Sequence, residues 1–287
     1  MKALIAGGNG QLGQELQKKV PAGWTARFLS SRELDIRDAA AVSKAATESG
    51  PDLIINAAAY TAVDKAEEER DLAFAVNAEG AGLLAAAAAT VGARVIHLST
   101  DFVFDGSRSS PYRPEDEPHP ISVYGASKAA GEQQVLAAGG NHVIVRTSWL
   151  YAASGRNFVR TMLRLMGERP EIGVVADQVG SPTWAGGLAG AIWAIAARPE
   201  MAGIHHWSDA GVASWYDFAV AIREEALAAG LLNTAAEIIP LRTQDYPTAA
   251  KRPPYSVLDK SSTWEQLGFR APHWRMNLRR MLAELQG

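Results

Sequence analysis

A tyrosine and a lysine stand four residues apart in VYGASKAAGE, residues 123–132. At this spacing on a helix, the two side chains lie on the same face. A phenol with a pKa of about 10 exchanges protons poorly at neutral pH, but a nearby ammonium stabilises the phenolate and lowers that pKa. Tyr124 and Lys128 therefore predict a pair that transfers a proton, and the small residues between them leave room for a ligand.

The segment before this helix strengthens the prediction. The run STDFVFDG, residues 99–106, ends an apolar stretch with Thr100 and Asp101. Both residues should then lie at the carboxyl end of a strand, where ligands bind in open α/β sheets. Thr100 can hydrogen-bond the same substrate oxygen as Tyr124. The alternative interpretation, a solvent-facing Tyr/Lys pair at helical spacing, is disfavoured in this context.

A second candidate site is the glycine-rich turn GGNGQLG, residues 7–13. Gly7, Gly10 and Gly13 permit positive φ, a close approach to a pyrophosphate and tight packing of helix on strand. The helix that follows offers free N–H groups to phosphates. The turn predicts dinucleotide binding, and a plain glycine turn is the alternative.

The end of the next strand reads FLSSRELD, and no acid stands where one would hold a ribose 2′-hydroxyl. Ser30, Ser31 and Arg32 suit a 2′-phosphate better, which predicts a preference for NADPH or the use of both NADPH and NADH. A solvated Ser-Arg loop is the alternative. Asp35 and Ile36 follow and are placed to flank the adenine.

The elements that must position these residues alternate between short apolar strands and helices, as in parallel βαβ units. Strands that are apolar throughout need helices on both faces, which predicts an α/β fold with a doubly wound, Rossmann-like parallel sheet. We expect strands at residues 2–6, 25–29, 53–56, 94–100 and 142–147, and helices at 11–20, 38–49, 65–90 and 122–138.

Four prolines between residues 107 and 120 predict a long loop over the carboxyl edge of the sheet. Beyond it we expect helices at 157–167, 184–197 and 215–229. These predict a dinucleotide-binding domain over residues 1–150, to which later segments return, and a smaller substrate-binding lobe over residues 151–287.

Composition excludes several classes of protein. The 287 residues carry a net charge of −3, which gives no basic footprint for nucleic acid. The absence of cysteine excludes disulfides, thiolate metal sites and a cysteine nucleophile. The longest apolar stretch, residues 81–98, is broken by Gly92 and Arg94 and predicts a packed helix followed by a strand. We expect a soluble cytoplasmic protein without membrane contact.

Four sequence motifs together resemble the extended short-chain dehydrogenase/reductase family, and within it the reductases of dTDP-4-dehydro sugars. The motifs are the glycine turn, Asn56-Ala57-Ala58, Ser99-Thr100-Asp101 and Tyr124-Gly125-x-x-Lys128. The resemblance covers most of the chain, through NAAAYTAVDKAEEE (56–69), RTSWLY (146–151), NFVRTML (157–163), DQVGSPTW (177–184) and YPTAAKRPPYSVLD (246–259).

The resemblance implies hydride transfer from the nicotinamide to C4 of dTDP-4-dehydro-β-L-rhamnose, giving dTDP-β-L-rhamnose for cell-surface polysaccharide such as O-antigen. Tyr124 would protonate the forming alkoxide, with Lys128 and Thr100 in support. The sugar nucleotide would contact Thr100, Asp101, Trp149 and, at the diphosphate, Arg252. The cofactor would contact the glycine turn and the ends of the second and third strands: Gly7, Gly10, Gln11, Leu12, Gly13, Ser30, Arg32, Asp35, Ile36, Ala57, Ala58, Ala59, Tyr60, Thr61, Tyr124 and Lys128.

Some members of the family dimerise around a metal held by acids. Glu15 is present here, but WAGGLAGAIWAI (184–195) carries no acid, so we expect no metal and at most a weak homodimer. His205 and His206 alternate faces on a strand and are interpreted as structural. The acidic residues 67–69 are interpreted as a solvated helix face.

Three rival functions share these motifs. A nucleotide-sugar dehydratase needs a further acid after the threonine-aspartate pair, where this chain has Phe102. A C4 epimerase remains open on sequence alone. So does a non-catalytic regulatory subunit like the one paired with methionine adenosyltransferase. The base and sugar specificity rest on the resemblance.

Overall fold

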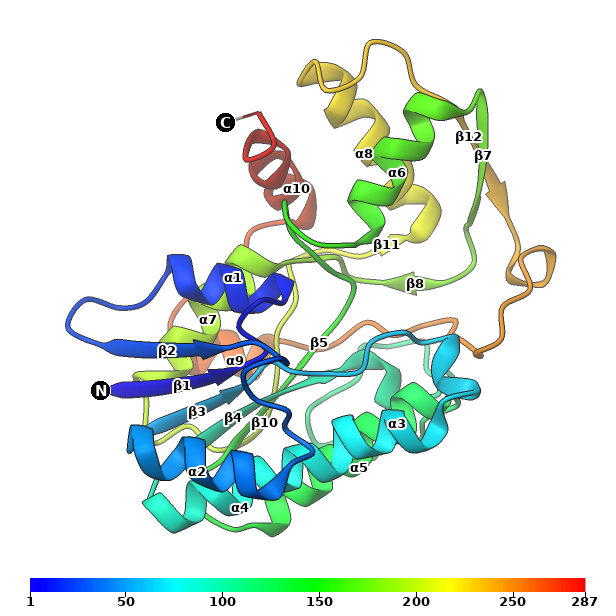
Figure 1. The fold of residues 1–287 in the computed structure, drawn as a ribbon. Coiled ribbons are helices and arrows are strands. Elements are labelled where there is room, and N and C mark those ends of the chain that lie inside the picture. The colour runs from blue at the N-terminus through cyan, green and yellow to red at the C-terminus, as the bar shows by residue number, and fades with distance from the viewer. Residues whose placement is uncertain (287) are drawn as a thin grey trace.

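A computed structural model describes residues 1–286 of the chain. Its centre is a six-stranded sheet in which all neighbouring strands run parallel, in the order β2-β1-β3-β4-β5-β10 (Figure 1). The strands are β1 (Lys2–Ala6), β2 (Thr25–Leu29), β3 (Leu53–Asn56), β4 (Arg94–Thr100), β5 (Val143–Thr147) and β10 (Gly203–His206). The predicted doubly wound parallel sheet is confirmed. The strand expected at His205 and His206 is β10, and it joins the sheet as a sixth strand, a place that the sequence pattern did not predict.

Helices cover both faces of this sheet, because its strands are buried and apolar on both sides (Figure 1). One face carries α1 (Gln11–Lys18), α7 (Ala185–Ala196) and α9 (Ser261–Leu267). The other carries α2 (Ala39–Ser49), α4 (Gly80–Val91) and α5 (Val123–Ala137). Segments from the second half of the chain therefore complete the layer that α1 begins.

Three helices begin one residue later than predicted, because their first predicted residue is an N-cap. The side chains of Asp38, Ser122 and Asn157 accept backbone N–H groups at the starts of α2, α5 and α6 (Phe158–Glu168). Capping oxygens of this kind take up donors that the first turn leaves free.

The predicted helix over residues 65–90 is divided in the structure. It comprises η1 (Lys65–Glu67), α3 (Arg70–Phe74), the π-turn η2 (Ala75–Glu79) and α4. Arg70–Val91 is the one helical run in the described part that is long and apolar enough to span a membrane, and half of its most apolar window is buried inside the structure. The predicted packed helix followed by a strand is confirmed here by α4 and β4.

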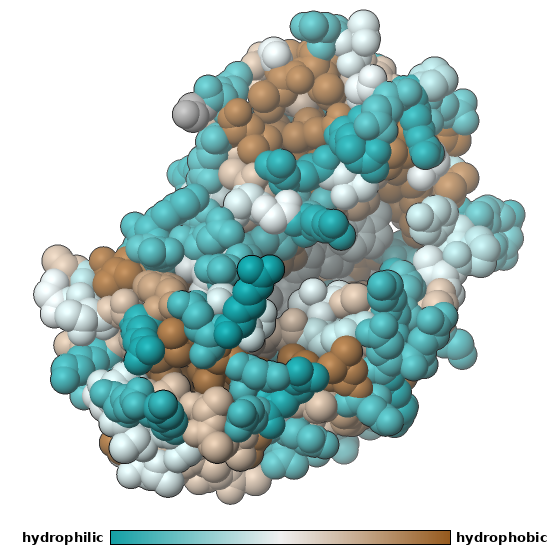
Figure 2. All heavy atoms as spheres, in the orientation of Figure 1, coloured by the Kyte–Doolittle hydropathy of each residue, from teal (hydrophilic) through white to brown (hydrophobic). Residues whose placement is uncertain are grey.

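A second group of elements lies beyond the carboxyl ends of the strands (Figure 1). Its core joins α6, α8 (Trp215–Ala228) and α10 (Trp274–Ala283) to the parallel pair β7 (Glu171–Val175) and β12 (Glu237–Leu241). The short pairs β6 (Leu150–Tyr151) with β9 (Thr183–Trp184) and β8 (Val179–Gly180) with β11 (Ala213–Ser214) lie near its base. Figure 2 shows the molecule hollowed between this group and the sheet. The division near residue 150 stays a prediction.

Candidate active site

The glycine turn lies at the point where the strand order reverses, between β1 and β3. Gly7 has φ +82°, and a Cβ on it would lie 2.6 Å from the Ala58 nitrogen. A Cβ on Gly13 would lie 2.4 Å from the Gly7 oxygen. The turn therefore requires glycine at both positions, and it opens α1 with its N–H groups free for an anion.

Two cavities meet at this turn. One, of about 700 Å³, extends over the ends of β2 and β3. The other, of about 580 Å³, extends over the ends of β4 and β5 toward α5. They share lining residues at the turn and after β3, namely Asn9, Gly10, Ala57 and Ala59. We call them the adenosine cavity and the reaction cavity, because their places match the two ends expected of a bound dinucleotide.

The structure brings together most of the residues predicted to contact the cofactor. Those that line one or both cavities are Gly7, Gly10, Gln11, Leu12, Asp35, Ile36, Ala57, Ala58, Ala59, Tyr60, Thr61, Tyr124 and Lys128. The fit with a dinucleotide rests on this continuous cradle of glycine and alanine backbone at a helix N-terminus.

Three predicted cofactor residues line neither cavity. Gly13 serves the packing of the turn, and the Ser30 hydroxyl donates to Glu33 Oε2 at 2.7 Å. Arg32 is exposed. Ser31 and Arg37 line the adenosine cavity in their place, and Arg37 binds Asp35 through both its Nε and Nη2 nitrogens.

The three predicted catalytic residues, Thr100, Tyr124 and Lys128, all line the reaction cavity. Thr100 ends β4, and the other two project from the first turns of α5. A Cβ on Gly125 would lie 2.1 Å from the Phe102 oxygen, so the glycine lets α5 approach the end of β4.

The start of α5 is fixed from two sides. Ser122 caps the helix, and Glu67 Oε1 accepts the Val123 N–H at 2.9 Å. The interpretation of residues 67–69 as a merely solvated face therefore misses the contact that Glu67 makes with the start of α5.

The electrostatics of the pair differ from the expectation. Burial raises the pKa of Tyr124 to about 12, the Thr100 hydroxyl opposes this shift, and the Asp101 charge adds to it. Burial lowers the pKa of Lys128 to about 8, against the opposing charge of Glu132. The expected lowering of the Tyr124 pKa by Lys128 is not found, because burial dominates the shift. The lysine Nζ donates to the Leu98 carbonyl at 2.5 Å.

Asp101 is buried behind the wall of the reaction cavity and does not line it. Its Oδ1 accepts the Thr100 hydroxyl at 3.1 Å, and burial raises its pKa to about 6. Its contact is thus with Thr100, and the predicted direct contact with substrate is not supported by this placement.

Trp149 lines the reaction cavity at the end of β5. It is the one non-glycine residue with positive φ in the described part of the chain, at +46°. Its ring stacks on Trp215, with centroids 3.5 Å apart and planes 6° apart. Strain of this kind is typical of functional sites and could not be read from the sequence.

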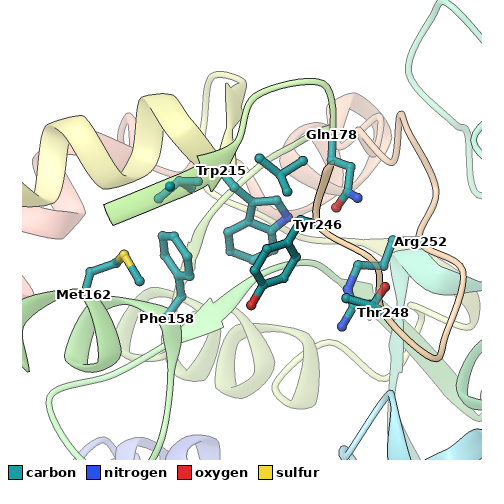
Figure 3. A pocket seen from close by; sticks show the side chains of 10 residues that line it. Phe158, Met162, Gln178, Trp215, Tyr246, Thr248 and Arg252 are labelled. Atoms are coloured by element: carbon teal, nitrogen blue, oxygen red, sulfur yellow. The ribbon is translucent and has the colours of Figure 1, made fainter. Parts of the chain in front are cut away.

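Trp215, the stacking partner of Trp149, lines a third cavity of about 280 Å³, which we call the distal cavity (Figure 3). Arg252 lies here and not in the reaction cavity, and its Nη2 is 2.7 Å from Asp64 Oδ2. The sequence analysis did not predict the rest of this wall. It comes from α6, β7, the segment between β7 and β8 and the loop after β12: Phe158, Met162, Val174, Gln178, Tyr246 and Thr248.

The residues considered for a metal have other partners. Glu15 is buried and binds Lys18 at 2.6 Å. The ring nitrogens of His205 and His206 face the carbonyls of Ala202 and Tyr112. Among residues 1–286, no group of three or more His, Asp or Glu side chains is placed to hold a metal ion.

A Rossmann-type sheet with a Tyr-x-x-x-Lys pair beside its glycine turn defines an oxidoreductase of the short-chain dehydrogenase/reductase class. The family model described as RmlD substrate binding domain matches residues 1–287. The chain belongs to this family, and the resemblance inferred from its motifs is confirmed.

Individual relatives match over nearly the whole chain. The dTDP-4-dehydrorhamnose reductase of Burkholderia thailandensis is 42% identical over 285 residues, covering 96% of each chain. The crystal structure of the Bacillus anthracis dTDP-4-dehydrorhamnose reductase in complex with NADP is 41% identical, with a TM-score of 0.92 and 99% of each chain covered. That of a Clostridium acetobutylicum dTDP-4-dehydrorhamnose reductase is 40% identical, with a TM-score of 0.94 and full coverage of both chains.

Proposed function

We propose that this protein reduces the C4 keto group of dTDP-4-dehydro-β-L-rhamnose with NADPH or NADH, giving dTDP-β-L-rhamnose. Relatives at about 40% identity carry the name of this activity, and one was crystallised with NADP. The observation that carries the proposal is the position of Thr100, Tyr124 and Lys128 on one wall of a cavity continuous with the glycine cradle.

When bound, the nicotinamide supplies the hydride. Tyr124, with a pKa of about 12, stays protonated at neutral pH and so holds a proton ready for the oxygen of the reduced ketone. The Thr100 hydroxyl lies on the same wall and orients that oxygen. Lys128, with a pKa of about 8, titrates closer to the working range than Tyr124 and is suited to return a proton to it.

The substrate would extend over two cavities. The keto sugar fits the reaction cavity, where its C4 oxygen can meet Tyr124. The stacked rings of Trp149 and Trp215 link this cavity to the distal one. There the Phe158 and Tyr246 rings offer apolar surface to a nucleotide base, and the Arg252 guanidinium offers charge to a diphosphate.

Phe102 argues against the dehydratase alternative. Its ring meets that of Tyr124 edge to face, with centroids 5.6 Å apart. An apolar side chain therefore occupies the place after Asp101 where a dehydratase would need an acid. The intact catalytic wall favours an enzyme over a non-catalytic regulatory subunit.

The test is turnover of dTDP-glucose, coupled to a dehydratase and an epimerase that supply the keto sugar, with NAD(P)H absorbance followed over time. We expect Tyr124→Phe to lower kcat by about 10²–10⁴-fold, the usual loss for an acid–base group, with cofactor binding retained. Tyr216→Phe, on α8 outside the three cavities, is the matched control and should turn over normally. Near-normal turnover of Tyr124→Phe would remove the tyrosine from proton transfer.

A further inference from the structure

A buried histidine lies behind the catalytic lysine and has no place in the mechanism above. His97 is in the middle of β4 and is fully buried. Its Nε2 lies 3.5 Å from Lys128 Nζ, and its Nδ1 lies 3.0 Å from the Asn56 Nδ2 nitrogen on the neighbouring strand. Asn56 and His97 are paired residues in the register of β3 and β4.

The tautomer of His97 follows from its neighbour. Asn56 Oδ1 accepts the Ala58 N–H at 3.1 Å, which fixes the amide with its NH₂ group toward the histidine. The NH₂ group can only donate, so His97 Nδ1 must accept. A neutral imidazole with Nδ1 as acceptor carries its proton on Nε2, the nitrogen that faces Lys128.

The protonation state of Lys128 is coupled to this arrangement. An ammonium has no lone pair, so the Nε2–H group and a charged lysine face each other as two donors. A neutral amine has a lone pair and accepts the Nε2–H. We propose that Asn56 holds His97 in the Nε2–H tautomer and that His97, as a positioning residue, favours the amine form of Lys128 and so eases release of its proton during turnover.

In this scheme the Tyr124 hydroxyl gives its proton to the alkoxide, and the resulting phenolate regains one as the Lys128 ammonium becomes an amine. The amine then accepts the His97 N–H until water reprotonates it. The scheme rests on the proposed reductase function, but the tautomer of His97 does not.

The other groups around Lys128 are consistent with this role. Glu132, one turn further along α5, is the nearby carboxylate and favours the ammonium, but it is buried and bound to Arg146. Tyr124 is on the same helix, and Ser127 and Asn77 beside it are neutral. Burial and the Lys128 charge hold the pKa of His97 well below its usual range, so the ring stays neutral.

The first experiment measures the tautomer in the unmodified protein, by ¹⁵N NMR of the histidine side chains, with the His97 signals assigned from a His97→Phe variant. We expect a protonated Nε2 and an unprotonated Nδ1. A protonated Nδ1, in either the other neutral tautomer or an imidazolium, would overturn the proposal whatever the enzyme's substrate proves to be.

The second experiment reverses the tautomer. In Asn56→Asp, a carboxylate at the same place should accept from Nδ1–H and leave Nε2 as an acceptor for the ammonium. Reduction needs the protonated form of Lys128, so the alkaline limb of the kcat profile should move up by about one pH unit or more. The same NMR measurement should show the proton on Nδ1.

The negative charge that Asn56→Asp introduces raises the pKa of Lys128 even without the histidine, so a double variant separates the two effects. In Asn56→Asp with His97→Phe, the charge remains and the imidazole is gone, and the limb should shift distinctly less. An equal shift in single and double variants would mean that charge alone acts, which overturns the proposal. If the double variant does not fold, the tautomer in Asn56→Asp decides alone. A His97 tautomer that is unchanged in this single variant would also overturn the proposal.

Discussion

At the scale of single residues, the adenosine cavity shows how the 2′ position of a cofactor can be recognised. Asp35 would repel a 2′-phosphate, but Arg37 binds its carboxylate through two nitrogens, at 2.9 and 2.6 Å. The guanidinium and the exposed Ser31 both line the cavity. We therefore expect Arg37 to offset the acid and to bind a 2′-phosphate.

We expect Arg37→Ala to lower the ratio of kcat/KM for NADPH over NADH by about tenfold, the order of effect of one lost charged hydrogen bond. The reason is that Asp35 loses its counter-charge and the phosphate loses a donor. Steady-state kinetics with both cofactors measure the ratio. Arg32→Ala is the matched control and should leave this ratio unchanged. If instead Arg32→Ala lowers the ratio and Arg37→Ala does not, Arg32 is the residue that binds the 2′-phosphate, as the sequence predicted.

The common location of the proposed catalytic residues could be predicted from the sequence better than that of the proposed cofactor residues. Tyr124 and Lys128 share a helix face by their spacing alone, and Thr100 is placed by the end of its strand. The direction in which each residue of a tight turn points is not encoded in this way. After β2, Glu33 folds back onto Ser30 through two hydrogen bonds and the turn leaves Arg32 in solvent.

At the scale of elements, one buried ion pair joins the strands β4 and β5, the helix α5 and the proline-rich loop. Arg146 on β5 binds both oxygens of Glu132 on α5, at 2.9 and 2.7 Å, and Glu132 also accepts the Ser99 hydroxyl of β4. Arg146 donates to the Pro114 carbonyl and approaches His206 of β10. The pair is fully buried, so removal of either partner would leave an unpaired charge in the core and lower the stability of the fold.

We expect Glu132→Gln to lower the free energy of unfolding by about 3 kcal/mol, because the guanidinium of Arg146 stays buried without a counter-charge. Urea denaturation followed by circular dichroism measures the loss. The double variant with Arg146→Met should lose less than the sum of the two single variants, because no charge is left unpaired. Strictly additive losses would show that the two side chains are not coupled.

Element boundaries and types were largely predictable, because apolar runs and helix caps are local signals. The place of the sixth strand was not, since β10 comes from a segment some 55 residues after β5 and only the fold shows that it joins the sheet. The π-turn η2 was also missed. It places Asn77, whose side chain bonds both backbone groups of Tyr60 and the Ser127 hydroxyl, and these partners are distant in sequence.

At the scale of the whole molecule, the hollow between the sheet and the second group of elements is crossed by a charged contact near the distal cavity. Arg252, on the loop after β12, binds Asp64, on the loop after β3, through two nitrogens. The contact holds the pKa of Asp64 below its usual range. Arg252 could therefore act in two ways, by holding the two sides together or by binding a diphosphate.

These two roles predict different kinetics. If Arg252 binds the substrate, Arg252→Gln should raise KM for the sugar nucleotide by about 10–100-fold, the effect of a lost hydrogen bond to a charged group, with kcat little changed. Asp64→Asn removes the bridge but keeps the guanidinium, so KM should stay the same or fall. Arg242→Gln, an exposed arginine paired with Asp245, controls for a general change of charge on this loop. An equal rise of KM in the Asp64 and Arg252 variants would instead assign Arg252 to holding the two sides of the hollow together.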